Sequence, residues 1–115
     1  FDLRKPNFIG NTGFDHNFCL STARRSLRQV ASVRSKKSGV AMQVATTEPG
    51  LQFYTGHKLG PPVPGLIKKL YGPFSGFCLE PQIWPDAPNN PHFPSALLQP
   101  NSTYRQQTTF AFHSG

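Results

Sequence analysis

Residues 27–47 read LRQVASVRSKKSGVAMQVATT, and this stretch decides the fold class of the chain. Along residues 27–34 the side chains alternate with the two-residue period of a β-strand. A second run of strand-forming residues covers 40–47, and the five residues between the runs, 35–39, end in glycine. Two such runs joined by a short Gly-containing loop predict a β-hairpin.

The rest of the chain predicts further short strands and no helix. A turn at Glu48-Pro49-Gly50 precedes a strand over 51–54, and the Pro- and Gly-rich residues 60–66 predict a loop, because proline cannot donate a ladder hydrogen bond. Residues 76–80 are an apolar run, and residues 104–112 alternate as a strand does. Many short strands separated by turns indicate an all-β sandwich or barrel.

Proline is concentrated in one segment, residues 81–100, which holds six of the twelve prolines. Such a density is often a sign of disorder. Trp84 and Phe93 favour an ordered loop laid on the surface of the fold instead. Trp84 either packs under this loop or forms an apolar wall beside a ligand.

Length and composition fit one small domain with a thin core, since the chain has 115 residues of which 37% are hydrophobic. It starts at Phe1 rather than Met, so we expect a fragment or a cut product. No run approaches the roughly 20 apolar residues of a membrane helix, and we expect no membrane partner. Cys19 and Cys78 lack metal or redox spacing, which predicts reduced packing residues in a reducing, cytoplasmic compartment.

The net charge of +7 raises the alternative of a nucleic-acid-binding module. Six of the twelve Lys and Arg residues lie within residues 24–37. Nucleic-acid binders usually interleave such charges with exposed aromatic side chains, yet residues 21–47 contain no aromatic residue. A solvated hairpin with a basic tip, and no nucleic-acid partner, is the favoured interpretation.

Glu80 is unusual because it ends the apolar run 76–80 and is one of only five acids in the chain. We expect a buried strand that stops at Pro81. A carboxylate in such a place is hydrogen-bonded, paired, or used in chemistry. The structural alternative is a Glu80 bonded to backbone groups of the proline-rich loop.

Several separated motifs resemble the C-terminal part of the aldose 1-epimerase family. They are FDLRKP at 1–6, GFDHNF at 13–18, TEPGLQFYTG at 47–56, and the whole run from Gly76 to Tyr104. The resemblance implies a large antiparallel β-sandwich with a sugar cleft on its concave face. It also implies that residues 1–115 are the C-terminal portion of a single domain whose upstream portion is absent and required for activity.

The resemblance further implies a reaction and an absence of cofactors. Family members interconvert the α and β anomers of aldohexoses such as glucose or galactose, without metal or cofactor. A base removes the proton of the C1 hydroxyl while an acid protonates the ring oxygen, and the opened ring closes on the other face. The alternative is a mutarotase-like carbohydrate-binding protein without turnover.

Three residues of this chain match family site positions. Glu80 matches the catalytic base, and Asp15 and Gln52 match residues that bind the sugar. A carboxylate accepts hydrogen bonds from two neighbouring hydroxyls, and an amide both donates and accepts. Taken alone, the sequence favours Asp15 as a turn residue capping Asn17, and only the resemblance reverses this. The alternative for Gln52 is an outward polar residue of an alternating strand.

The histidines of this chain are not expected to supply the acid. His16 adjoins Asp15, but neighbours on a strand point to opposite faces, and the family draws its acid histidine from upstream. His57, His92 and His113 show no catalytic or metal spacing and predict loop or surface roles. We therefore expect the 115-residue chain alone to be inactive. Pro81 and His57 depart from residues frequent in the family.

Overall fold

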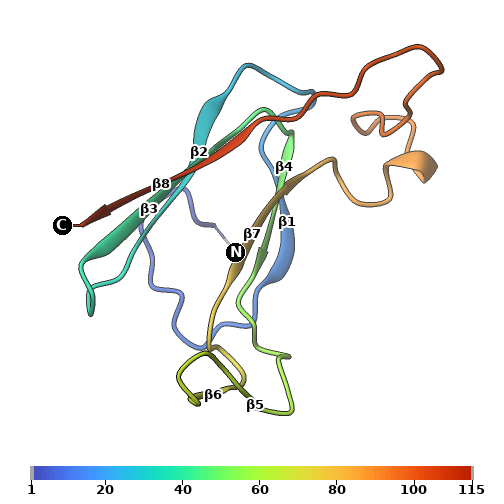
Figure 1. The fold of residues 1–115 in the computed structure, drawn as a ribbon. Helices are drawn as coiled ribbons and strands as arrows, with labels where there is room; N and C mark the ends of the chain where they lie inside the picture. Colours follow the sequence, from blue (N-terminus) through green and yellow to red (C-terminus); the bar gives the residue numbers. More distant parts are fainter. Residues whose placement is uncertain (1, 115) are drawn as a thin grey trace. The chain divides into compact units, whose positions relative to one another are not determined.

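The computed structural model describes residues 2–114, which form eight strands and one short 3-10 turn (Figure 1). The strands are β1 (Asp15–Cys19), β2 (Arg28–Arg34), β3 (Val40–Thr46), β4 (Gly50–Tyr54), β5 (Val63–Pro64), β6 (Leu70–Tyr71), β7 (Cys78–Gln82) and β8 (Thr108–Ser114), and the turn is η1 (Ala87–Asn89). The orders in the three sheets are β1-β4-β7, β2-β3-β8 and β5-β6. The predicted all-β class is confirmed, and no helix within residues 2–114 is long and apolar enough to cross a membrane.

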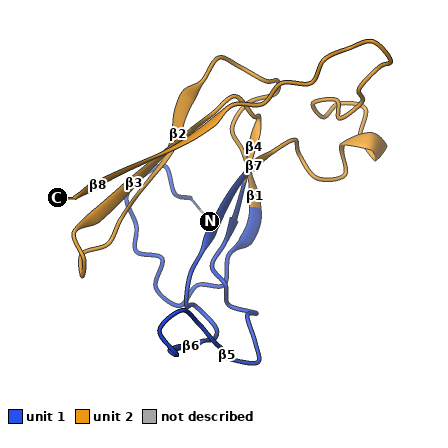
Figure 2. Ribbon diagram, viewed as in Figure 1, with its two compact units in different colours: residues 1–16, 52–80 blue, residues 17–51, 81–115 orange. Residues whose placement is uncertain are grey.

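The chain divides into two compact units, coloured separately in Figure 2. Unit 1 comprises residues 1–16 and 52–80, and unit 2 comprises residues 17–51 and 81–115. Each strand of the β1-β4-β7 sheet has residues in both units.

Unit 2 contains the predicted hairpin. Strands β2 and β3 pair antiparallel, with Val33 opposite Met42, and the register shifts between Gln29 and Ala31 at a bulge. Strand β8 adds to the other side of β3, with Phe112 opposite Met42. Because directly opposed residues share a face, this face of the sheet is apolar. The hairpin is confirmed, but the single two-residue period read over 27–34 is not, because the bulge places Gln29 and Ala31 on opposite faces.

Strand β8 begins later than the sequence predicts, at Thr108 rather than near Tyr104. The Gln107 carbonyl still accepts the Thr47 backbone N–H at 3.0 Å, but the backbone donor before Thr108 bonds to a side chain. The backbone N–H of Gln107 donates to Thr47 Oγ1 at 3.1 Å, and the Tyr104 hydroxyl donates to Gln106 Oε1 at 2.8 Å. Alternation in sequence therefore extends further than the ladder does.

A fully buried carboxylate, Glu48, lies in the turn between β3 and β4 and is 0% exposed. Arg24 holds both of its oxygens, with Nε at 2.8 Å from Oε1 and an Nη at 3.2 Å from Oε2. The paired carboxylate raises the pKa of Arg24 above its ordinary value. The Arg24 guanidinium also lies over the Tyr104 ring, 4.7 Å from its centroid. Bidentate pairing satisfies a charge that would otherwise be costly to bury.

Unit 1 has a small aromatic core. The rings of Phe14 and Phe53 are 5.0 Å apart, and Phe77 meets Phe53 edge-on at 6.2 Å. Buried Thr55 fastens the strand beside them, because its Oγ1 accepts the Phe14 N–H at 3.0 Å and donates to the Thr12 carbonyl at 3.0 Å. This core fixes which face of β1 and β4 is turned inward.

The expectation of a buried strand ending at Pro81 is wrong in two respects. Strand β7 runs from Cys78 through Pro81 to Gln82, and Phe77 and Cys78 are exposed. Among the described strands β7 is at the edge of its sheet. An edge position tolerates proline, which lacks only the donor, and the Pro81 carbonyl still accepts from Gln106 Nε2 at 3.1 Å.

The cysteines are free, as expected, but both Cys19 and Cys78 are exposed. The prediction that they are packing residues is therefore wrong. Their apolar sequence neighbours do not bury them, since β1 and β7, which carry them, are the two edge strands of this sheet within residues 2–114.

The proline-rich segment is ordered, as predicted. Trp84 Nε1 donates to the Pro49 carbonyl at 2.9 Å, and its ring meets Phe93 edge-on at 5.1 Å. Ala87, at the start of η1, is buried. These contacts support the packing role of Trp84.

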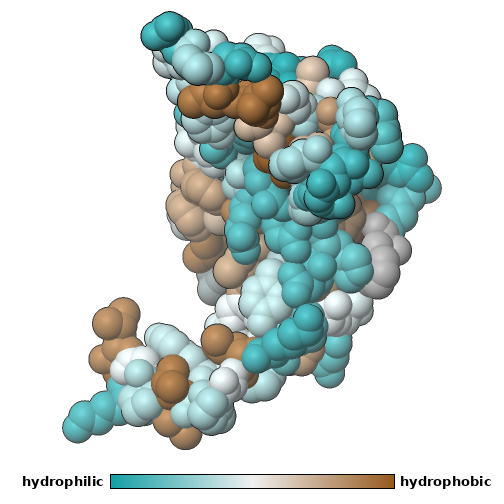
Figure 3. All heavy atoms as spheres, turned by 90° about the vertical axis from the view of Figure 1, so that its right-hand side faces the viewer, coloured by the Kyte–Doolittle hydropathy of each residue, from teal (hydrophilic) through white to brown (hydrophobic). Residues whose placement is uncertain are grey.

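The predicted loop over 60–66 includes a two-residue ladder, in which Val63 pairs with Tyr71 and Pro64 with Leu70. The hairpin tip carries apolar side chains in solvent, with Leu66 98% and Ile67 81% exposed. In the space-filling view of Figure 3, brown marks hydrophobic residues at the lower end, where this hairpin lies. The tip is the most exposed apolar element of unit 1.

We predict that Gly56→Ala destabilises the protein by about 2–4 kcal/mol. Gly56 has φ +66°, and an added Cβ would lie 2.6 Å from the Gly76 carbonyl oxygen. Urea unfolding of the variant measures the loss. Gly76→Ala is the matched control, since a Cβ there meets nothing within 4 Å, and equal losses at both positions would contradict the prediction.

We predict that Arg24→Met costs about 3 kcal/mol, because it leaves Glu48 buried without its partner. Arg25→Met is the control, because Arg25 is exposed and adjacent in sequence. Thermal unfolding of the two variants compares them. A loss for Arg24→Met no larger than that for Arg25→Met would show that the ion pair does not hold the turn.

Candidate functional site

The three predicted site residues lie on three adjacent strands and share one face of unit 1. Asp15 is on β1, Gln52 on β4 and Glu80 on β7, and the sheet order is β1-β4-β7. Successive side chains of a strand point to opposite faces. Phe14 and Phe53, which precede and follow Asp15 and Gln52, pack together in the core. Asp15 and Gln52 are therefore on the opposite, open face.

Glu80 follows the same alternation. It lies an odd number of positions after Phe77, whose ring contacts Phe53 in the aromatic core. The Glu80 side chain is exposed, and within residues 2–114 its carboxylate forms no hydrogen bond or ion pair. The alternative of a carboxylate bonded to the proline-rich loop is not observed. Within residues 2–114, Glu80 is thus an unpaired carboxylate on the open face.

Asp15 is held by two side chains, one on each carboxylate oxygen. Gln52 Nε2 donates to Oδ1 at 2.9 Å, and Lys58 Nζ lies 3.3 Å from Oδ2. These hydrogen bonds lower the pKa of Asp15 below its ordinary value of 3.8, and the bond from Gln52 has the larger effect. Asp15 is therefore ionised at neutral pH and accepts hydrogen bonds. Its alternative role as a cap for Asn17 is not observed.

Gln52 is half-buried, and its amide binds Asp15. It is therefore more than an outward polar residue of an alternating strand. An amide that donates to a carboxylate orients that carboxylate, and the pair presents acceptors to the open face. Asp15 and Gln52 together form a polar patch that suits neighbouring hydroxyl groups.

His16 lies on the face opposite to Asp15, as predicted. Its ring meets the buried Phe14 edge-on, with centroids 6.3 Å apart. Its Nδ1 accepts the backbone N–H of Asp15 at 3.0 Å. His57 packs between the rings of Tyr54 and Phe74, with centroids at 5.5 and 6.2 Å. These contacts give both histidines local structural roles.

Lys58 was not predicted as part of this site. It follows β4 by four residues, and only the chain reversal at Gly56, which has φ +66°, returns it to Asp15. The Tyr54 hydroxyl accepts the backbone N–H of Lys58 at 3.2 Å and closes this turn. Gly56 indicated a turn, but the sequence did not indicate that Lys58 would contact Asp15.

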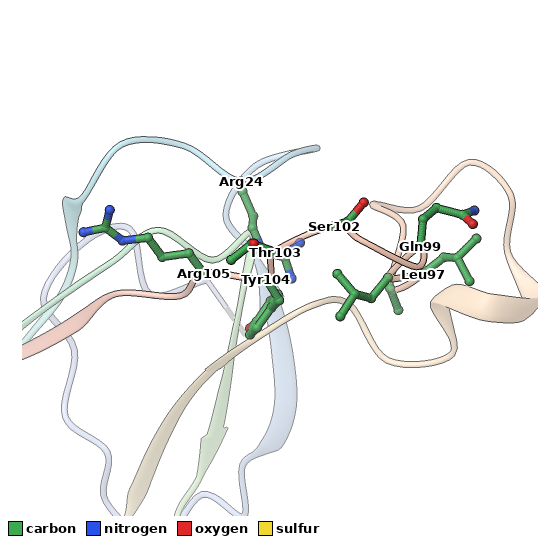
Figure 4. A pocket seen from close by; sticks show the side chains of 9 residues that line it. Arg24, Leu97, Gln99, Ser102, Thr103, Tyr104 and Arg105 are labelled. Atoms are coloured by element: carbon green, nitrogen blue, oxygen red, sulfur yellow. The ribbon is translucent and has the colours of Figure 1, made fainter.

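Unit 2 contains a separate hollow of about 400 Å³. It is lined by Arg24, Ala96, Leu97, Leu98, Gln99, Ser102, Thr103, Tyr104 and Arg105 (Figure 4). None of the three predicted site residues lines it. Arg24 there is already paired with Glu48, so the hollow lacks a free guanidinium at that position.

The basic stretch is partly used inside the fold. Arg24 binds Glu48, and Arg28 donates to Ser21 Oγ at 2.9 Å and to the Thr46 carbonyl at 3.4 Å. Two of the cations counted for a nucleic-acid surface thus serve the protein interior. Among residues 2–114 no cluster of His, Cys, Asp and Glu has the geometry of a metal site.

Comparison with known proteins places the chain in a family. The sequence profile described as aldose 1-epimerase matches residues 1–111. The chain belongs to the aldose 1-epimerase family. It is 47% identical over 119 residues to the galactose mutarotase of Bos taurus and 34% identical over 125 residues to the aldose 1-epimerase of Escherichia coli (strain K12), each match covering 97% of this chain.

The chain spans about a third of the length of these curated relatives, 34% and 36% respectively. A crystal structure of an aldose epimerase homologue from C. elegans superposes with a TM-score of 0.77 at 24% identity. That match covers 89% of this chain and 30% of the other. The structural likeness confirms the predicted fold class.

We predict that Gln52→Leu raises the pKa of Asp15 toward its ordinary value of 3.8, because the Gln52 hydrogen bond is the largest cause of the lowering. Because the pKa of Asp15 is lower in the folded state, ionised Asp15 stabilises the fold at a pH above the unfolded-state pKa. This stabilisation is lost as the pH falls through the folded-state pKa. Carboxyl NMR titration measures it. Lys58→Met should raise the pKa less, and the reverse order would contradict the assignment.

Proposed function

We propose that the intact protein is an aldose 1-epimerase that interconverts the α and β anomers of aldohexoses such as glucose or galactose. Family membership supports this proposal, together with one observation at the site. Asp15, Gln52 and Glu80 come from separate parts of the sequence, yet adjacent strands carry them on one open face. Asp15 and Gln52 are hydrogen-bonded to each other, and the Glu80 carboxylate has no partner within residues 2–114.

Glu80 is the proposed general base. It takes the proton of the C1 hydroxyl, the bond between C1 and the ring oxygen breaks, and the ring oxygen receives a proton from an acid. The C1 aldehyde then rotates, and ring closure from its other face gives the second anomer. A base must be reachable and free to accept a proton, and the exposed, unpaired Glu80 carboxylate meets both requirements.

Asp15 and Gln52 are the proposed sugar-binding residues. The Asp15 carboxylate uses one acceptor position on each oxygen for a protein donor. A carboxylate offers about four acceptor positions, so further positions are available to sugar hydroxyls. Binding of these hydroxyls next to Glu80 would place C1 for proton transfer, which is the entropic contribution of a preformed site.

The acid is proposed to come from a part of the domain outside this chain. Residues 1–115 then form its C-terminal portion, and the 115-residue chain alone lacks half of the proton-transfer chemistry. We further propose that the reaction needs no metal or cofactor, that no nucleic acid or membrane takes part, and that the protein is cytoplasmic, for which the two free thiols give support.

We predict that Glu80→Gln in the intact protein lowers kcat at least about 100-fold, the usual contribution of a general base. Polarimetry of α-D-glucose and α-D-galactose measures the rate. Because Glu80 has no partner within residues 2–114, the substitution should leave the thermal midpoint and sugar affinity nearly unchanged.

Two outcomes separate the competing functions. A variant with the native rate would overturn the assignment of Glu80 as base. Sugar binding with no mutarotation by the native protein itself would favour the carbohydrate-binding alternative, which requires Asp15 and Gln52 but no base.

A further inference from the structure

One cation of unit 1 faces the proposed sugar-binding carboxylate. Lys58 Nζ lies 3.3 Å from Asp15 Oδ2, and its side chain is 69% exposed, against 41% for that of Asp15. Lysine side chains on a surface are usually solvated and mobile, and their ion pairs contribute little to stability. Because this pair lies on the open face, we expect it to affect ligand binding more than folding stability.

We propose that Lys58 is a positioning residue that sets the orientation of Asp15 for the sugar, and this inference rests on the proposed function of the site. The terminal torsion of an aspartate is broad, so a single donor leaves the carboxylate plane free to rotate. Gln52 holds Oδ1 and Lys58 holds Oδ2. Two donors on different oxygens fix the plane, and therefore the direction of the remaining acceptor positions.

The backbone of Lys58 is itself held in place. Its N–H donates to the Tyr54 hydroxyl at 3.2 Å, and Tyr54 lies two residues after Gln52 on β4. Side chains two residues apart on a strand point to the same face. The reversal at Gly56 is closed by the N–H of Leu59, which donates to the Gly56 carbonyl at 3.1 Å. Strand β4 thus positions both donors of Asp15, one directly and one through Tyr54.

Preorganisation of Asp15 affects binding more than the chemical step. A sugar that meets a carboxylate already oriented does not have to order it on binding. The Lys58 ammonium contacts a ligand-binding group and not the proposed base. Loss of Lys58 should therefore raise KM and the dissociation constant and leave kcat unaltered, which is the signature of uniform binding.

The test uses the intact protein with Lys58→Met, which keeps an unbranched side chain only one heavy atom shorter and removes its charge. We expect KM for α-D-galactose to rise about two- to fivefold, the range of an exposed ion pair, at constant kcat. The same rise should appear in the dissociation constant measured in the Glu80→Gln background, where turnover does not interfere.

Three further variants make the result specific. Lys58→Arg should restore KM to within about twofold of the native value, because a guanidinium also donates to a carboxylate. In an Asp15→Asn background, Lys58→Met should have no further effect, since the two residues act as one unit. Lys37→Met, at the exposed hairpin loop, is the control and should leave KM unchanged.

The outcomes separate this inference from the function on which it rests. If Glu80→Gln abolishes mutarotation and Lys58→Met leaves KM and the dissociation constant unchanged, the positioning role is wrong and the enzyme assignment stands. If Lys58→Met lowers kcat and the thermal midpoint together, Lys58 is structural and the positioning role is likewise wrong. If Glu80→Gln retains the native rate, the proposed function itself is contradicted, whatever the result for Lys58→Met.

Discussion

The buried ion pair between Arg24 and Glu48 is the constraint on which unit 2 depends. A carboxylate with no exposure to water cannot remain charged without a partner, and Arg24 supplies two donors to it. In the same turn, the Pro49 carbonyl accepts a hydrogen bond from the Trp84 indole N–H. The hairpin β2-β3 and the proline-rich segment are thereby attached to one short turn, although they are distant in sequence.

The predictable part of the fold is the part set by short-range periodicity. Alternation and a Gly-containing loop specified the hairpin of β2 and β3, because its two strands are joined locally, but they did not specify the bulge between Gln29 and Ala31. The burial of β7 was not predictable, because apolar composition does not reveal whether a strand lies at an edge. For the same reason Cys78 was expected inside and lies outside. The start of β8 depends on Thr47, which is 60 residues from Gln107.

Only part of the candidate site, too, could be predicted from the sequence. Asp15, Gln52 and Glu80 were predicted from a family resemblance, and the strand order brings them to one face. Alternation also predicted that His16 points away from Asp15. Lys58 was missed because its contact depends on a positive φ at Gly56 and on a hydrogen bond to Tyr54. Neither the backbone angle nor the partner can be obtained from residue type alone.

The edge position of β7 has a consequence for motion. In the described part of the sheet, β7 has a ladder partner on one side only, and Pro81 contributes no amide donor to it. Segments with few backbone hydrogen bonds open at a lower free energy than the whole molecule. The strand that carries Glu80, the proposed base, is thus expected to open more readily than β4, which is paired on both sides.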